Sequence, residues 1–354
     1  MIDILRDILP YISGLNTLPW ILIGFIITVL IARITGREKI DKIMKKIGLI
    51  LLYFFVPVLL FRIFLNTTFG KNEIEFAIVT SIVILYTYIL AFIFAEYTAN
   101  KNKLKGSKRN LYIKTTLTNQ GRSSAFIGGA LLAIEAWKVP AAIFIALVGI
   151  ALFFIMPFIL SHLHKKESKN PEKEEHIKAL PWYLKLYPWY LLIFVIAAVT
   201  LHATTGATTS TLGDVEPLFL FYTALTIPAA LYYVGAGIHP SDLKTTEIKK
   251  LIGLDKRNQT SDHWGWVRKM FHLTVIITPI ITLVILTPLL MLKIIPSAWF
   301  AVIIINVFLP ITSTNMFLLP YGIDKKSTAH SITWTTLVCV PIVVALITLF
   351  ELYL

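Results

Sequence analysis

The chain alternates long apolar runs with short polar segments. A bilayer core about 30 Å thick is crossed by about 20 mostly apolar helical residues, and ten runs reach or approach that length. The predicted spans are Pro19–Ile34, Ile47–Leu65, Phe76–Ala95, Leu111–Ile134, Val139–Leu160, Pro188–Leu201, Pro217–Ile238, Met270–Leu292, Ala298–Leu319 and Ile332–Tyr353. The pattern predicts an all-α polytopic membrane protein with ten transmembrane helices. Because the fourth run contains the polar stretch TLTNQGRSS, an odd count with a re-entrant hairpin is the alternative.

The composition and the charge distribution agree with a membrane protein. Charged residues are 15% of the chain and the mean hydropathy is +0.74, whereas soluble domains carry roughly 25% charged residues. The net charge of +13 is compatible with a nucleic-acid partner, but 27 of the 33 Lys and Arg residues lie in or beside the loops after spans 1, 3, 5, 7 and 9. This is the positive-inside pattern, so we expect a cell (plasma) membrane protein with both termini extracellular, the lipid bilayer as its surroundings and no nucleic acid.

Prolines recur in matching order in the two halves of the sequence. Pro19 and Pro188 open spans 1 and 6, and Pro57 and Pro228 lie within spans 2 and 7. Five spans per half is an odd number, so the second half is predicted to be inverted in the membrane, as in many transporters. The predicted divisions are a first repeat over residues 1–163, a cytoplasmic linker over 164–186 and a second repeat over 187–354. Chance similarity between apolar helices is the alternative.

The fourth span of each predicted repeat is interrupted by polar residues and by glycine or proline. The interrupting residues are Asn119, Gln120, Gly121, Arg122, Ser123 and Ser124 in span 4, and Pro310, Thr312, Ser313, Thr314 and Asn315 in span 9. Gly and Pro favour a break, and Ser, Thr and Asn favour the start of a new half-helix. Irregular backbone at this depth needs cover from protein or a watery cavity. We therefore predict broken helices 4 and 9, with Gly121 and Pro310 as crossover or hinge positions beside Pro57 and Pro228.

The expected chemistry of these breaks favours an anion. Two half-helix N-termini near the midplane present free N–H groups and partial positive charge, and Arg122 adds a full charge in a geometry suited to carboxylate. No Asp or Glu lies at the middle of a span, so an antiporter that uses a buried carboxylate is disfavoured. The sequence shows no catalytic pair, no metal-ligand spacing and no dinucleotide motif, so we expect no enzyme activity, no cofactor and no metal.

These polar residues also have structural interpretations. Ser and Thr side chains can bond to their own helix, and Asn315 can bridge two helices. Arg122 can reach an interface instead of a cavity. A polar cluster that occurs in both predicted repeats favours substrate binding over these structural roles. The residues predicted to contact the substrate are Asn119, Gln120, Arg122, Ser123, Ser124, Thr312, Ser313, Thr314 and Asn315.

Several segments together resemble the auxin efflux carrier family of PIN-like permeases, in a prokaryotic form. They are KIGLILLYFFVPVLLF around Pro57, LTIPAALYYVGAGI around Pro228, and FLPITSTNMFLLPYGIDKKSTAHSITWTTL around Pro310. The resemblance covers nearly the whole chain and implies two inverted five-helix repeats. It also implies scaffold and crossover domains, each built from both repeats, with helices 4 and 9 crossing at the substrate. The asparagine implied to contact the substrate is Asn119, although Ser123 also fits that position because NQGRSSAFIGGALL is longer than the family pattern.

The predicted function is a secondary transporter that moves a small organic anion, a carboxylate, by alternating access and in the direction of efflux. One alternative is a sodium-coupled organic-anion symporter of the bile-acid symporter type, whose span-4 motif resembles GRSSAF. The acidic and glutamine ion ligands implied by that family for span 9 are absent from this sequence. Another alternative is a membrane ligand sensor that does not transport. The anion, the coupling ion and the oligomeric state stay open, with a homodimer as one option.

Overall fold

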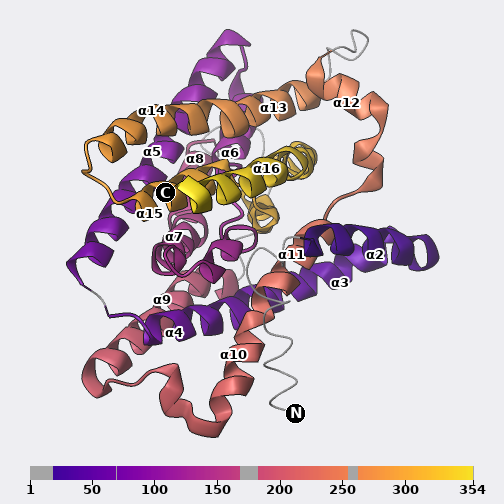
Figure 1. Ribbon diagram of the computed structural model, residues 1–354. Helices are drawn as coiled ribbons and strands as arrows, with labels where there is room; N and C mark the ends of the chain where they lie inside the picture. The colour runs from indigo at the N-terminus through magenta and orange to yellow at the C-terminus, as the bar shows by residue number, and fades with distance from the viewer. Residues whose placement is uncertain (1–18, 69, 168–181, 254–261, 354) are drawn as a thin grey trace. The chain divides into compact units, whose positions relative to one another are not determined.

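The computed structural model describes residues 19–68, 70–167, 182–253 and 262–353, and these residues are almost entirely helical (Figure 1). The part of the chain so described contains no β-strand, and its one β-type pairing is an isolated antiparallel bridge between Arg122 and Ile311. Most of the predicted linker, residues 168–181, lies outside the described residues.

Among the described residues, six helical stretches are long and apolar enough to cross a membrane: Arg37–Leu65, Lys71–Lys101, Lys138–Leu163, Thr209–Ala236, His263–Met291 and Lys325–Tyr353. Shorter apolar helices cover Trp20–Thr35, Trp189–Thr205 and Ser297–Phe308. Helix α5 (Lys71–Lys101) exposes large apolar side chains about every fourth residue, including Ile74, Ile78, Ile82, Ile89 and Ile93. A continuous exposed apolar face of this length suits lipid and not water. The chain is therefore an all-α membrane protein, while the count of ten spans stays a prediction.

Prolines shape three of the long helical stretches in the same way. A π-helical turn ends two residues before each of Pro57, Pro157 and Pro279, at η3 (Leu51–Phe55), η5 (Ala151–Ile155) and η9 (His272–Ile277). The proline ring clashes with the carbonyl four residues earlier, and a wider turn removes the clash while the helix continues. Pro228 lies in the first turn of α11 (Thr226–Ala236), just after a break at Leu225. Pro57 and Pro228 thus both follow an irregular turn, and their hinge role stays a prediction.

The chain divides into two compact units, and each unit contains segments from both halves of the sequence. Unit 1 comprises Met1–Ile78, Ser124–Ala146 and Trp189–Pro240, and unit 2 comprises Val79–Ser123, Leu147–Pro188 and Ser241–Leu354. Helices α5, α7 (Lys138–Ile150) and α9 (Trp182–Thr205) have residues in both units.

Unit 1 is assembled around a close helix pair. Its elements, apart from the shared helices, are α2 (Trp20–Thr35), α3 (Arg37–Ile50), η3, α4 (Val56–Leu65), η4 (Gly128–Ala133), η6 (Thr209–Val215), α10 (Glu216–Ala224) and α11. Helices α2 and α11 lie side by side (Figure 1). A β-carbon on Gly24 or on Gly235 would collide with the backbone of Tyr232 or of Ile21, respectively. These glycines allow the two backbones to touch, as small residues do between membrane helices.

Unit 2 contains both helices that end at interruptions. Its elements, apart from the shared helices, are α6 (Gly106–Thr118), η5, α8 (Met156–Glu167), η7 (Pro240–Leu243, shared with unit 1 at its first residue), α12 (Thr245–Ile252), α13 (Asp262–Phe271), η9, α14 (Thr278–Met291), α15 (Ser297–Phe308), η10 (Ser313–Tyr321) and α16 (Lys325–Tyr353). Helix α13 packs on α16 (Figure 1), where Trp264, Val267, Leu251 and Trp334 form a buried cluster. This packing fixes α16, which passes the interruption of span 9.

Candidate functional site: the crossing of two interrupted helices

The expected interruptions of spans 4 and 9 are present. Helix α6 ends at Thr118, and helical structure resumes only at Gly128, in the short 3-10 helix η4. Helix α15 ends at Phe308, because the residue before a proline avoids the helical conformation and Leu309 is extended before Pro310. Structure resumes at Ser313 in the 3-10 helix η10. Both restarts are 3-10 helices and not α-helices.

The two interruptions are joined backbone to backbone within unit 2. The Ser123 N–H donates to the Pro310 carbonyl at 2.9 Å, and the Thr312 N–H donates to the Gly121 carbonyl at 2.9 Å. Arg122 and Ile311 face each other between these bonds as an antiparallel bridge. The bridge gives partners to backbone groups that have no helical partner, which an apolar environment demands. Segments 121–123 and 310–312 therefore cross at one point, which we call the crossing.

Side chains from neighbouring elements hold the crossing in place. The Ile311 N–H donates to Thr335 Oγ1 of α16 at 3.1 Å. Asn315 lies against Gly121 so closely that a β-carbon there would stand 2.5 Å from Asn315 Oδ1. Since Gly121 is not at a positive φ, its small size, and not its conformational freedom, is what this position requires.

Arg122 is the charged residue of the crossing. Its side chain is 7% exposed, and the terminal nitrogens Nη1 and Nη2 have no hydrogen-bond partner among the described residues. No carboxylate in those residues pairs with it. Insertion scales put the cost of a charge at the bilayer centre at about 2.5–3.5 kcal/mol, so a guanidinium without a counter-ion is expensive. The prediction that Arg122 reaches an interface by snorkelling does not fit this burial.

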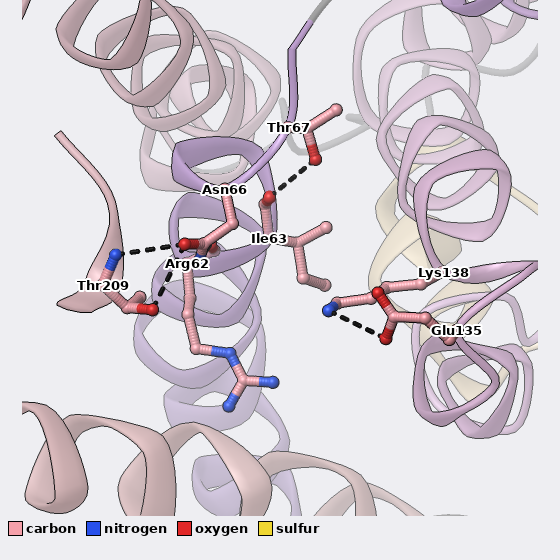
Figure 2. A network of polar contacts seen from close by, with 7 residues as sticks. All are labelled: Arg62, Ile63, Asn66, Thr67, Glu135, Lys138 and Thr209. Atoms are coloured by element: carbon pink, nitrogen blue, oxygen red, sulfur yellow. Dashed lines mark hydrogen bonds and ion pairs between the residues drawn. The ribbon is translucent and has the colours of Figure 1, made fainter. Parts of the chain in front are cut away.

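Arg62 in unit 1 shows how a satisfied arginine looks in this fold. Its Nη1 donates to Thr223 Oγ1 at 2.6 Å and to the Leu220 carbonyl at 3.3 Å, which ties α4 to α10. Figure 2 shows the side chain extending along α4, with the ion pair of Lys138 and Glu135 (3.4 Å) drawn nearby. Arg62 therefore has a structural explanation that Arg122 lacks.

The amides beside Arg122 have a defined orientation. Asn119 Nδ2 donates to the Thr115 carbonyl at 2.8 Å and to Thr328 Oγ1 at 3.2 Å. Gln120 Nε2 donates to the Thr116 carbonyl at 3.3 Å. Because a carbonyl can only accept, each amide must turn its nitrogen toward its own helix. The oxygens Asn119 Oδ1 and Gln120 Oε1 are left buried and without a partner in the described part of the chain.

The other predicted site residues divide into two groups. Thr312 accepts from the Thr314 N–H at 3.3 Å and caps η10, and the two hydroxyls lie 2.9 Å apart. Ser124 Oγ, Ser313 Oγ and both polar atoms of the Asn315 amide have no partner among the residues described. Ser124 already belongs to unit 1, as do the hinge candidates Pro57 and Pro228, so these three residues are not part of the crossing in unit 2.

One part of the sequence prediction was wrong. The Ser and Asn residues of span 4 were expected to cap a half-helix beginning near them, yet η4 begins at Gly128 after Ile127 and has no side-chain cap. A single six-residue 3-10 helix does not provide the expected dipole. The polar stretch forms the crossing instead, because its backbone pairs with 310–312 and not with a following helix. The positive charge of the site therefore comes from Arg122.

Sequence reasoning missed several buried polar residues around the crossing. Lys114, near the start of the predicted span Leu111–Ile134, is 3% exposed on α6, and Thr335 and Thr328 of α16 bond to the two interruptions. A run of Thr residues before Asn119 was the available signal for α6. For α16, no sequence signal pointed to the crossing.

Comparison of the chain with protein-family models and with curated proteins gives no match. The described residues contain no group of three or more His, Cys, Asp or Glu side chains that could hold a metal ion. The crossing is therefore the feature of the molecule that indicates a function.

Proposed function

We propose that this protein is a secondary transporter that carries a small organic carboxylate across the cell membrane by alternating access, in the direction of efflux. The observation that carries the proposal is Arg122, a buried guanidinium with two unpartnered terminal nitrogens at the point where two interrupted helices cross. Ionisable residues inside membranes generally mark substrate or ion pathways. A carboxylate matches the forked donors of the guanidinium and neutralises its charge.

The organisation of the chain supports the proposal. Interrupted helices at a repeat interface are a recurrent feature of transporters built from inverted repeats. Here α6 and α15 occupy the fourth place in each proposed five-helix repeat, and both are followed by a break and a 3-10 helix. Unit 2 carries the crossing, and we propose that it moves as the crossover domain while unit 1 serves as the scaffold, in ten spans with extracellular termini. This arrangement is the one implied by the resemblance to the auxin efflux carriers, and we propose membership of that family.

Counterflow in proteoliposomes tests the proposal. Vesicles loaded with an unlabelled carboxylate should accumulate the same labelled carboxylate, with monocarboxylates and dicarboxylates tested as separate panels. Arg122→Gln should abolish accumulation, because the variant removes the charge while it keeps a polar side chain that can donate hydrogen bonds. Arg33→Gln is the matched control, since it removes the same charge from an exposed position on α2. Transport of organic cations with no carboxylate transport would refute the proposal.

A second candidate function, a sodium-coupled symporter, is favoured by one specific observation. Asn119 Oδ1, Gln120 Oε1 and Asn306 Oδ1 are buried acceptors without a partner among the described residues, and all three lie near the C-terminal ends of α6 and α15. Amide oxygens and helix C-terminal carbonyls suit hard cations such as sodium. Thermal stabilisation by sodium, absent with potassium at equal ionic strength, would favour this candidate over uncoupled anion transport.

A membrane sensor is the remaining alternative, and the same assays separate it from a transporter. A sensor binds the carboxylate in calorimetry, and Arg122→Gln weakens that binding, yet vesicles show no counterflow in either direction.

A further inference from the structure

Two histidines of unit 2 lie against each other where α13 packs on α16. The imidazole rings of His263 and His330 have centroids 4.9 Å apart and planes at 74° to each other, and His263 Nδ1 lies 3.1 Å from Ser327 Oγ. Both histidines precede the predicted spans Met270–Leu292 and Ile332–Tyr353, and neither has a part in the function proposed above. Imidazole is the side chain whose charge ordinarily changes between pH 5 and 8, so this histidine pair is a candidate site for a proton.

The contacts of the histidine pair oppose protonation in the folded protein. A carbonyl only accepts, so His330 Nδ1 donates to the Lys326 carbonyl at 3.0 Å and a neutral His330 has its proton-accepting nitrogen at Nε2. His263 Nε2 is buried and has no hydrogen-bond partner among the described residues. A charged His263 would therefore have a buried N–H donor without an acceptor, with the second ring centroid 4.9 Å away.

The charged side chains around the histidine pair do not compensate a further positive charge. Those that interact with His263 are Lys326 and Asp324 at the start of α16 and Glu247 on α12. Asp324 Oδ2 already accepts a backbone N–H of α16 at 2.7 Å, and Glu247 already pairs with Lys250 at 2.7 Å. The surroundings thus contain two lysines and two carboxylates that have other partners. A proton on the pair is expected to weaken the packing of α13 on α16.

Hydrogen bonds connect the histidine pair to the crossing. The first turn of α16 contains Ser327, which contacts His263, and Thr328, which accepts from Asn119 Nδ2 at 3.2 Å. Asn119 Nδ2 also lies 3.2 Å from Met270 Sδ on α13, the helix that carries His263. Asn119 therefore contacts both helices that the pair joins, and it stands three residues before the arginine of the crossing. A change in the packing of α13 on α16 must alter these contacts of Asn119.

We propose that His263 and His330 form a proton-binding site whose occupancy opposes carboxylate binding at the crossing, so that the proton is the coupling ion. The proposal rests on the proposed function, in that it takes Arg122 as the group that binds the anion. A proton from water adds to one imidazole, α13 loosens on α16, and Asn119 loses its fixed orientation. By linkage, carboxylate binding returns that proton to water. In a membrane that is negative inside, exchange of an outgoing anion for an incoming proton is favoured by the membrane potential, which agrees with efflux.

Thermal unfolding at two pH values tests the proton site without any ligand. An unfolded histidine takes up a proton below about pH 6.5 while the folded pair resists it, so stability present above that pH is lost as the pH falls. The purified full-length protein in detergent is compared at about pH 7.5 and about pH 5.5, on either side of the imidazole range. On acidification, the unfolding temperature of the wild type should fall by at least about 2 °C more than that of His263→Gln, which cannot titrate.

Two further variants make this measurement specific. His330→Gln should show the same reduced fall as His263→Gln, so the result does not depend on the folding of one variant. His272→Gln is the matched control, since it removes an exposed histidine of the same unit and should behave like the wild type.

Calorimetry with an anion tests the coupling to the crossing. The probes are pyruvate and fumarate, a monocarboxylate and a dicarboxylate that stay ionised at both pH values. The wild type and His272→Gln should bind the anion at least about fivefold more weakly at the lower pH, which is the lower end of the usual coupling between two sites. In His263→Gln the affinity should be nearly the same at the two pH values.

The outcomes separate the inference from the proposed function. If acidification lowers the unfolding temperature equally in the wild type and in both variants of the pair, the pair is not a proton site and the inference is wrong. If the unfolding data support the site but the affinity depends on pH equally in the wild type and His263→Gln, the coupling is wrong and the carboxylate function stands. If neither these anions nor the counterflow panels give any binding or transport, the carboxylate function and the coupling fail, whereas the unfolding data still support the proton site.

Discussion

The two interruptions that meet at the crossing contribute different things. The first, residues 119–127, contains Arg122 and the unpartnered oxygens of Asn119 and Gln120, and no side chain caps the helix that follows it. The second, residues 309–312, contains no charged side chain, and its backbone is fixed by Pro310, by the Thr312 cap and by a bond from Ile311 to α16. The unpartnered polar groups and the charge are therefore in the first interruption, which we propose as the recognition segment, and the structural bonds are in the second.

This division has a physical reason. An unsatisfied charge destabilises the segment that carries it, so that segment needs a rigid partner. The two hydrogen bonds between 121–123 and 310–312 provide one. Substitutions in the first interruption should therefore change ligand binding, and substitutions in the second should change stability.

The largest expected effect is on Arg122. Replacing it by Met removes a buried charge without a counter-ion and keeps the apolar stem, so the free energy of unfolding should rise by up to about 3 kcal/mol while carboxylate binding is lost. The matched substitution Arg62→Met should lower stability by about 1–3 kcal/mol, because Arg62 donates to Thr223 and Leu220 in unit 1. Thermal unfolding in detergent, followed by tryptophan fluorescence, measures both. Destabilisation by Arg122→Met would indicate a structural arginine and would contradict the comparison.

The next effect concerns the contact between Gly121 of the first interruption and Asn315 of η10, which directly follows the second interruption. Gly121→Ala places a methyl group 2.5 Å from Asn315 Oδ1 and 3.0 Å from Leu152 Cδ1, so we expect a loss of about 2 kcal/mol. Gly129→Ala is the matched control, since its β-carbon would meet Ile227 at an ordinary 3.9 Å. The double variant Gly121→Ala, Asn315→Ala should recover part of the loss, because it removes the colliding oxygen. Equal unfolding temperatures for the two alanine variants would show that Gly121 and Asn315 are not in close contact.

The sequence predicted the class of fold and the positions of both interruptions, and the physical basis is clear at particular residues. A continuous helix over residues 119–124 would expose a run of polar side chains to lipid, and Pro310 interrupts the helical hydrogen bonds. A break is therefore expected in both segments. The sequence did not predict where structure resumes. Ser123 and Ser124 are good caps by residue type, but the backbone of Ser123 pairs with Pro310, which lies far away in the sequence. The partner Thr335 on α16 was missed for the same reason.

A smaller effect is expected at Thr335, which supports the second interruption from α16. Thr335→Val keeps the shape of the side chain and removes the acceptor of the Ile311 N–H, which leaves a buried backbone donor without a partner. The cost should be about 1.5 kcal/mol. Thr335→Ser keeps the hydroxyl and should cost clearly less. Chemical denaturation of the detergent-solubilised protein compares the two variants, and equal losses would mean that the bond to Ile311 contributes nothing measurable.

The smallest expected effect on stability concerns one residue in each interruption: Thr312, which caps a helix, and Ser124, which does not. Thr312→Ala removes the side-chain oxygen that accepts from the Thr314 N–H at the start of η10, and the loss of such a cap costs about 1 kcal/mol. Ser124→Ala in the first interruption should cost less than about 0.5 kcal/mol, because its hydroxyl caps nothing and has no partner among the residues described. Carboxylate affinity, measured by calorimetry, should fall less in Thr312→Ala than in Arg122→Ala, since the threonine orders the backbone and the arginine carries the charge. A weaker affinity in Thr312→Ala than in Arg122→Ala would reverse the assignment of recognition to the first interruption and of order to the second.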